Sequence, residues 1–340
     1  MNKQISLISA SLMAVFFSVN SLAASSAGDE VKEYLVSRVS KMKTASADFV
    51  KNAQKYDEKI ETFGSYKKAY ADDLVGVEDL VKKMQENYKA MDSFGYETVE
   101  GIVAGVPSLS HYDVYLDAGV PKSEGPEDVA DVVLKLSNGE VIDRQGPSFT
   151  YIIEPALWGG DSRWIVPIDL DGDGKMVARE SLPKTEVLTA VAEDTDRKVG
   201  ELLSDSKAWN PTTDDLFGAM IEMTPTLSEY FEEWKESKFS EEKSGRFYAV
   251  SRVSDMKGIM SSCYVIYKAV QNEVGQKDKA LNKAIIAGYD GIMSFLDALA
   301  SQEVSGKLNA SLIDELASQA KSRTDKLVPQ IEQAYALIKS

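Results

Sequence analysis

The stretch GPSFTYIIEPALWGGDSRWIVPIDLDGDGKMVARE, residues 146–180, lies near the middle of the chain, and the sequence on both sides of it has helical patterning. Its second half matches every position of the calcium-loop pattern D-x-D-x-D-G-x5-E. Calcium takes six to eight oxygen ligands, and this spacing wraps the chain around one ion, with a glycine at the sharp turn. The alternative is a solvated acidic turn. The expected calcium ligands are the side chains of Asp169, Asp171, Asp173 and Glu180 and the backbone carbonyl of Lys175.

The residues before the loop indicate what kind of calcium site this is. Pro167 and the extended segment RWIVPI, residues 163–168, argue against a helix that leads into the loop. A paired calcium sensor needs helices on both sides of each loop. We therefore expect a lone, EF-hand-like clip with a structural role.

Outside this stretch, apolar residues recur every three or four positions, which is the spacing of amphipathic helices. Examples run from Val31 to Phe49, from Val77 to Met91 and from Leu281 to Leu299. Two apolar runs also flank Asn138-Gly139, a strong hairpin signal because both turn positions tolerate positive φ. The predicted fold is mainly α: two helical bundles with a small β-hairpin and the calcium loop between them. The expected divisions are residues 24–127 for the first bundle, 128–182 for the middle part and 183–340 for the second bundle.

The first 23 residues have the pattern of a secretory signal peptide. Lys3 precedes an apolar run, and Ser21-Leu22-Ala23 places small residues where cleavage after Ala23 is expected. No cysteine follows that run, so we expect no lipid anchor. We also expect no later segment apolar enough to span a membrane. The sequence thus predicts an exported protein, periplasmic or secreted, without stable membrane insertion.

The charge balance is strongly acidic, with 38 Lys and Arg against 54 Asp and Glu and a net charge of −16. Such a surface disfavours nucleic acid and anionic membranes and is compatible with cations, although solubility alone would also account for it. The single cysteine, Cys263, excludes an intramolecular disulfide.

Three polar groups between residues 97 and 154 have the composition of metal ligands. Carboxylate, phenolate and imidazole suit iron, manganese and calcium. Any one pair on its own is also compatible with a solvated helix face, whereas three groups flanked by glycine and proline turns favour a shared site. The candidate iron ligands are Glu97 and Glu100, His111 and Asp113 (with Asp117 four residues later), and Tyr151 and Glu154.

Further along the chain, Arg252 and Asp255 lie in a long helical stretch. The arginine there could neutralise buried carboxylates that face it, or it could form a plain salt bridge between helices. The sequence leaves both interpretations open.

The segment FTYIIEPALWGG, residues 149–160, resembles the motif region of the imelysin-like family, in which a His-x-x-Glu pair is followed by an apolar residue, Trp and Gly. Three further segments resemble the family in the same order along the chain. The resemblance implies an exported all-helical protein of two four-helix bundles. Several such proteins serve iron acquisition, including the periplasmic component of a bacterial ferrous-iron uptake system. The further segments are YETVEGIVAGVPSLSHYDVYLDAG at 96–119, SRVSDMKGIMSSCYVIYKAV at 251–270 and KLVPQIEQAYAL at 326–337.

One position departs from the family motif. Glu154 matches the glutamate, but Tyr151 stands where the resemblance implies a histidine. Tyrosine is still a good ferric ligand, whereas a zinc peptidase site would normally use that imidazole. The chain has one histidine and no H-E-x-x-H pattern, which leaves a nucleophilic triad without a base.

We therefore expect a metal-binding protein that captures iron and passes it to an inner-membrane permease, with a structural calcium ion, rather than an enzyme. Two alternatives remain. One is a metallopeptidase of the imelysin type, and the other is an envelope-interaction protein that calcium stiffens and that binds no iron. Convergence of Glu100, Asp113 and Glu154 would favour the iron site over the interaction protein.

Overall fold

The computed structural model describes residues 26–118, 131–168, 180–237, 247, 249 and 251–340. In this part of the chain, helices dominate and the strands form two small two-stranded sheets. The prediction of a mainly α fold is confirmed. The predicted signal peptide lies outside the described residues, and so do four of the five predicted calcium ligands, all except Glu180.

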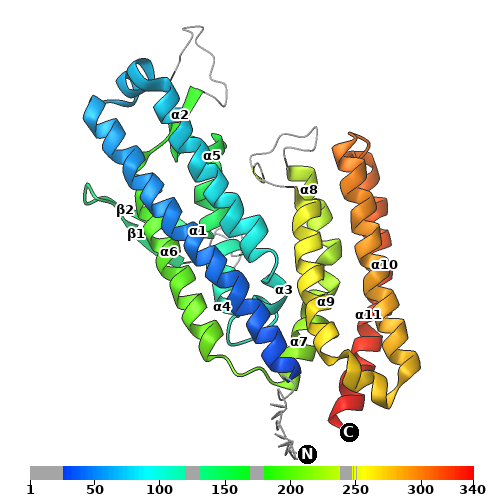
Figure 1. Cartoon of the computed structure of the whole chain (residues 1–340). Helices are drawn as coiled ribbons and strands as arrows, with labels where there is room; N and C mark the ends of the chain where they lie inside the picture. Colours follow the sequence, from blue (N-terminus) through cyan, green and yellow to red (C-terminus); the bar gives the residue numbers. More distant parts are fainter. Residues whose placement is uncertain (1–25, 119–130, 169–179, 238–246, 248, 250) are drawn as a thin grey trace, which may run out of the picture.

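The first group of helices is built on α1 (Ala27–Phe63), which packs along α2 (Tyr66–Met91) and α6 (Thr185–Ala208) (Figure 1). A capping box between Ser26 and Asp29 starts α1, and Gly64, with φ 72°, ends it. The predicted boundary at residue 183 placed α6 in the second bundle, but α6 packs along α1. The predicted apolar stripe of α1 is buried: Val31, Leu35, Val39, Met42, Ala45 and Phe49.

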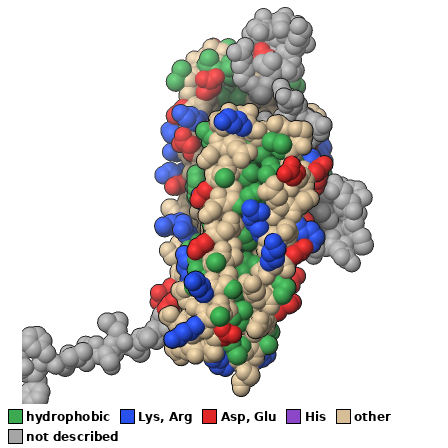
Figure 2. All heavy atoms as spheres, turned by 90° about the vertical axis from the view of Figure 1, so that its right-hand side faces the viewer, with side chains coloured by type: hydrophobic (Ala, Val, Ile, Leu, Met, Phe, Trp, Pro, Cys, Tyr) green, Lys and Arg blue, Asp and Glu red, His purple; other side chains and the backbone are tan. Residues whose placement is uncertain are grey.

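The second group contains α9 (Arg252–Lys277), α10 (Lys279–Val304) and α11 (Ala310–Lys339), which stand beside the first group in Figure 1. The shorter α7 (Thr213–Met223) and α8 (Tyr230–Glu236) pack against α9 and α11. On the side of the molecule that lies at the right in Figure 1, hydrophobic side chains are interspersed with charged ones (Figure 2).

Helix α10 is the one helix of the described residues that is long and apolar enough to cross a membrane by length and composition, with a mean hydropathy of 1.2 in its best window. The expectation that no segment after the signal would pass this test is therefore wrong. In the structure α10 packs against α9 and α11 and buries Leu281, Ile285 and Tyr289, which is the packing of a bundle helix.

Two antiparallel strand pairs lie in the middle part of the chain. Strands β1 (Asp131–Lys135) and β2 (Val141–Gln145) form the predicted hairpin, and Gly139 has a φ of 86° at its turn. Strands β3 (Ile165–Pro167) and β4 (Ser181–Pro183) pair across the acidic loop. The amide of Ile168 donates a 2.6 Å hydrogen bond to the Glu180 carbonyl, so the two ends of that loop are held together.

The individual elements between the long helices are short. Within the described residues, three of them are π-helical turns, in which an amide bonds to the carbonyl five residues earlier, as from Glu97 to Asp92 and from Glu154 to Phe149. Such turns are rare and often occur at functional sites. The π turns are η1 (Asp92–Tyr96), η2 (Val114–Ala118) and η3 (Phe149–Ile153); the short helices are α3 (Glu100–Val103), α4 (Ser110–Asp113), α5 (Glu154–Trp158) and the 3-10 turn η5 (Pro225–Ser228).

Candidate metal centre

Six buried carboxylic acids gather where α9 of the second group meets the segments that follow α2. None of them is more than 7% exposed. Burial of a carboxylate away from water costs free energy unless a cation, a proton or a set of hydrogen bonds compensates it. The members of this acidic cluster are Asp92, Glu97, Glu100, Asp117, Glu154 and Asp255.

The π turns place four of these acids. Asp92 opens η1 and Glu97 follows it, Asp117 lies within η2, and Glu154 directly follows η3. A π turn carries one residue more than an α-helical turn, so it changes which side chains share a face. Each of the three π turns in the described residues therefore presents a carboxylate to the same cluster.

Asp92, Glu97 and Asp117 form the innermost part of the cluster. Each offers a carboxylate oxygen within 4.8 Å of the other two. An ion that holds oxygen ligands at about 2.0–2.6 Å accommodates oxygens up to about 5 Å apart. Asp92 Oδ1, Asp117 Oδ1 and both carboxylate oxygens of Glu97 are buried and accept no hydrogen bond. The geometry of this triad thus fits a single cation.

Arg252, at the start of α9, brings a positive charge to the cluster and is itself 4% exposed. Its Nη1 donates a 3.0 Å hydrogen bond to Asp255 Oδ2 and lies 3.7 Å from Glu97 Oε1. Its Nε donates to Glu233, and the rings of Tyr230 and Phe247 lie 4.9 and 4.4 Å from the guanidinium carbon. Arg252 therefore faces the buried carboxylates Glu97 and Asp255 and also forms a salt bridge between helices with Glu233, so both interpretations that the sequence left open apply.

Arg252 is the one cation of the described residues that opposes the raised pKa values in the cluster, and one guanidinium does not balance six carboxylates. Burial raises the pKa of Asp92, Glu97 and Glu100 well above the usual range of a carboxyl, and repulsion between the acids raises it further. Burial also raises the pKa of Asp117 to about 6 and that of Asp255 to about 7, although Arg252 opposes both shifts. Protons or a bound cation must therefore compensate much of the cluster's charge.

Glu154 is held differently from the other acids. The amides of Ala249 and Phe247 donate hydrogen bonds of 2.7 and 3.1 Å to its two oxygens. Burial raises its pKa to about 7, while these amides and Arg252 lower it. Phe247 has a φ of 58°, an uncommon conformation for a residue other than glycine. Glu154 thus anchors the backbone just before α9.

The predicted iron ligands divide into three sets. Glu97, Glu100 and Glu154 belong to the cluster. Asp113 lies at its edge, where it accepts a 2.6 Å hydrogen bond from the Tyr96 hydroxyl. The other two lie outside the cluster: His111 is exposed beside the ring of Tyr112, and Tyr151 accepts a 3.0 Å hydrogen bond from Arg163.

The position of Tyr151 has a physical explanation. Residues three apart share a face of an α-helix, which is the reason that Tyr151 and Glu154 were expected to converge. The intervening residues form the π turn η3, which is wider and turns less per residue. The two side chains consequently point in different directions.

Sequence reasoning missed Asp92, Tyr230 and Glu233 as parts of the site. A signal for Asp92 was present: it follows Tyr88 by four positions and so continues the buried stripe of α2 with a carboxylate. A charged residue on the apolar face of a helix is rare unless it has a partner. Tyr230 and Glu233 had no comparable signal.

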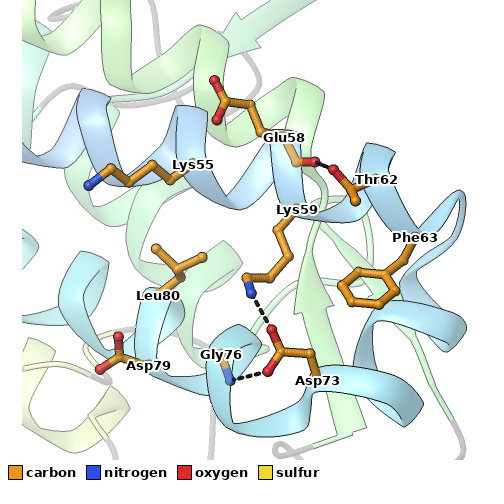
Figure 3. A pocket seen from close by; sticks show the side chains of 9 residues that line it. All are labelled: Lys55, Glu58, Lys59, Thr62, Phe63, Asp73, Gly76, Asp79 and Leu80. Carbon is orange, nitrogen blue, oxygen red and sulfur yellow. Dashed lines mark hydrogen bonds and ion pairs between the residues drawn. The ribbon is translucent and has the colours of Figure 1, made fainter.

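A pocket between α1 and α2 provides a contrast (Figure 3). There Asp73 points toward Lys59, with which it forms an ion pair, and it accepts a 3.1 Å hydrogen bond from the amide of Gly76. The carboxylate is partly exposed and its oxygens have partners. This pocket therefore lacks the uncompensated charge that distinguishes the acidic cluster.

Comparison with known proteins identifies the family. The family model for imelysin (peptidase M75) matches residues 149–336, which is more than half of the chain and includes Glu154, Arg252 and Asp255. No curated protein matches the chain. The matched region begins at the π turn that positions Glu154 and continues through most of α11. The chain therefore belongs to the imelysin family.

Proposed function

We propose that this protein binds a divalent transition-metal cation, ferrous iron above all, in the acidic cluster and captures it for uptake in the periplasm. The observation that carries the proposal is the triad of Asp92, Glu97 and Asp117. Each residue offers a carboxylate oxygen within 4.8 Å of the other two, and each has at least one buried oxygen without a hydrogen-bond partner. Buried acids with raised pKa values in one place are typical of functional sites.

The donor set supports a hard or borderline cation. The triad offers carboxylate oxygens only, which suit manganese, magnesium and calcium and also serve iron in carboxylate sites within helical bundles. Membership of the imelysin family supports iron among these cations, because the exported proteins that this chain resembles include iron-uptake proteins. The cation would be cargo, passed on to an inner-membrane iron permease.

The protonation of the same acids would also allow the cluster to release the cation. A cation binds carboxylates after they lose their protons, so affinity depends on pH. Asp117 and Asp255, with pKa values of about 6 and 7, lose their protons close to neutrality. Competition with protons would keep the affinity moderate, as capture followed by transfer requires.

A structural calcium ion in the acidic loop is the second part of the proposal. The ligands would be Asp169, Asp171, Asp173, Lys175 and Glu180. The pairing of β3 with β4 supports it, because it brings the ends of a loop of the required length together.

The test is anaerobic titration of Ala24–Ser340 with Fe²⁺, and of the same protein with Mn²⁺, in the presence of calcium. We expect saturable binding by the wild type that Asp92→Asn and Asp117→Asn weaken by about 100-fold or more, since the loss of an outer partner alone costs about 10- to 100-fold. The matched control is Asp325→Asn, because that aspartate is exposed on α11. Absence of binding in the wild type, or equal affinities in the cluster and control variants, would overturn the proposal.

A metallopeptidase remains the second candidate, favoured by the raised pKa of Glu154, about 7, which suits a general base. The discriminating measurement is hydrolysis of an unstructured peptide by the Zn²⁺- and Mn²⁺-loaded protein. Turnover that Glu154→Gln abolishes, with metal binding retained, would favour the enzyme over the capture protein.

A further inference from the structure

A pocket of about 570 Å³ adjoins the acidic cluster between α3, α4 and η2 on one side and α7, η5 and α8 on the other. Its volume lies within the range of about 300–1,000 Å³ of small-ligand sites. Among the described residues that line it there are five carboxylates and no lysine or arginine. We call this pocket the acidic vestibule, and its carboxylates are Glu100, Asp113, Glu222, Glu229 and Glu233.

Glu100 is shared by the vestibule and the cluster. It is 1% exposed, and Tyr230, which also lines the vestibule, donates a hydrogen bond to its Oε1. Its Oε2 is buried without a hydrogen-bond partner. Glu97, a member of the triad, is three residues earlier and interacts with Glu100 electrostatically. Glu100 therefore stands in the wall between the vestibule and the triad, with one oxygen available to a cation.

The outer part of the vestibule is acidic as well. Glu222 and Glu229 are exposed, and no lysine or arginine of the described residues forms an ion pair with either. Glu233 pairs with Arg252, which ties the vestibule to the cluster from the other side. Carboxylates that line a hollow focus the field within it and raise the local concentration of cations.

We propose that the acidic vestibule is the access route to the metal centre and that it holds a hydrated divalent cation before the cation sheds water and reaches the triad. Glu222 and Glu229 attract the hydrated ion. One carboxylate oxygen of Glu100 replaces a water ligand of the ion, and the ion then passes to Glu97. This inference rests on the proposed function, since it assigns the route to the same site.

The test is stopped-flow association of Mn²⁺ with the whole mature chain, in the wild type and in the double variant Glu222→Gln/Glu229→Gln. The matched control is Glu61→Gln/Glu273→Gln, which removes the same charge from exposed positions on α1 and α9. We expect the vestibule variant to lower the association rate constant roughly three- to tenfold at low ionic strength and to flatten its dependence on salt. Equal rate constants in the vestibule and control variants would overturn the inference.

A second measurement separates this inference from the proposed function. In Asp92→Asn/Asp117→Asn, Mn²⁺ electron paramagnetic resonance should show weak binding that disappears when Glu222→Gln/Glu229→Gln is added. Tight binding in the wild type without this weak site would contradict the role of the vestibule and support the metal centre. Weak binding that depends on Glu222 and Glu229, without tight binding in the wild type, would support the role of the vestibule and contradict the metal centre. If neither is seen, both proposals are wrong.

Discussion

Gly258 of α9 lies directly against the backbone of Glu97. A Cβ atom at position 258 would be 2.9 Å from the Glu97 carbonyl oxygen and 3.0 Å from its carbonyl carbon. Gly101 is similarly close to α9, since a Cβ there would be 2.4 Å from the Ser262 hydroxyl. Helix α9 can therefore approach the segment that carries Glu97 and Glu100 because neither glycine has a side chain.

The substitution Gly258→Ala should push α9 away from Glu97. Overpacking of this kind typically costs about 1–3 kcal/mol of stability, and displacement of Glu97 should also weaken metal binding. The control is Gly291→Ala in α10, where a Cβ meets nothing within 4 Å. That variant should gain about 0.5–1 kcal/mol, because alanine favours helix. Urea denaturation and Mn²⁺ titration measure both effects, and equal stabilities of the two variants would contradict the close approach.

Periodic segments of this chain were predictable because each carries its own signal. The stripe of α1, the hairpin turn at Gly139 and the extended residues before the acidic loop are local patterns. They depend on neighbours in sequence, and the structure confirms them. The family motif likewise pointed to Glu154, whose surroundings then proved to be a buried acidic cluster.

The composition of the cluster was only partly predictable because it depends on contacts between distant segments. Asp255 and Glu97 interact electrostatically because α9 packs on η1 and α3. No local pattern in the sequence specifies that packing. Tyr151 lies within the π turn η3, and this turn directs its side chain away from that of Glu154. Helical spacing alone does not reveal a π turn. Glu100 and Glu154 do lie in one cluster, with Asp113 at its edge, whereas His111 is exposed outside it.

Replacement of Arg252 by methionine should be among the most damaging changes in the protein. It leaves buried carboxylates without their guanidinium partner, and loss of one member of a buried ion pair costs about 3–5 kcal/mol. The control is Lys321→Met on α11, whose pair with Asp325 is exposed, so it should change stability by about 0.5 kcal/mol or less. Chemical denaturation measures both variants. Equal effects would show that Arg252 does not compensate the cluster.

Bound Mn²⁺ should restore part of the stability that Arg252→Met loses, because a cation in the triad supplies the missing positive charge. The increase in melting temperature on addition of Mn²⁺ should therefore be larger for Arg252→Met than for the wild type. An equal or smaller increase would indicate that the cation binds elsewhere.

Calcium should stabilise the protein independently of the acidic cluster. We expect calcium to raise the melting temperature of the wild type and of Asp117→Asn, but not of Asp171→Ala, which removes a central ligand of the loop. A ligand at 100 times its dissociation constant stabilises the native state by about 2.7 kcal/mol. Asp171→Asn is a milder companion variant that keeps one oxygen. A calcium response that survives in Asp171→Ala would contradict a site in this loop.

The stability of the metal-free protein should fall as the pH rises from about 4 to about 7. The pKa values of Glu154 and Asp255 are raised to about 7 and that of Asp117 to about 6 in the native state, whereas an unfolded chain has ordinary carboxyl pKa values near 4. Below about pH 4 both the native and the unfolded state hold these protons, and the stability that the raised pKa values contribute is fully present. Between the two values only the native state holds them, so the free energy of unfolding decreases by about 1.4 kcal/mol per pH unit for each such proton.

Denaturation in the presence of a chelator at several pH values between 4.5 and 8 measures this slope. Asp255→Asn should flatten it, since the amide cannot ionise, whereas Asp297→Asn on the exposed face of α10 should leave it unchanged. The stabilisation by Mn²⁺ should have the opposite trend and grow with pH, because the cation binds the deprotonated acids. If the stability of the metal-free protein instead increases from pH 4.5 to 7, these carboxyls are already ionised at low pH. Protons would then not compete with a cation for the cluster.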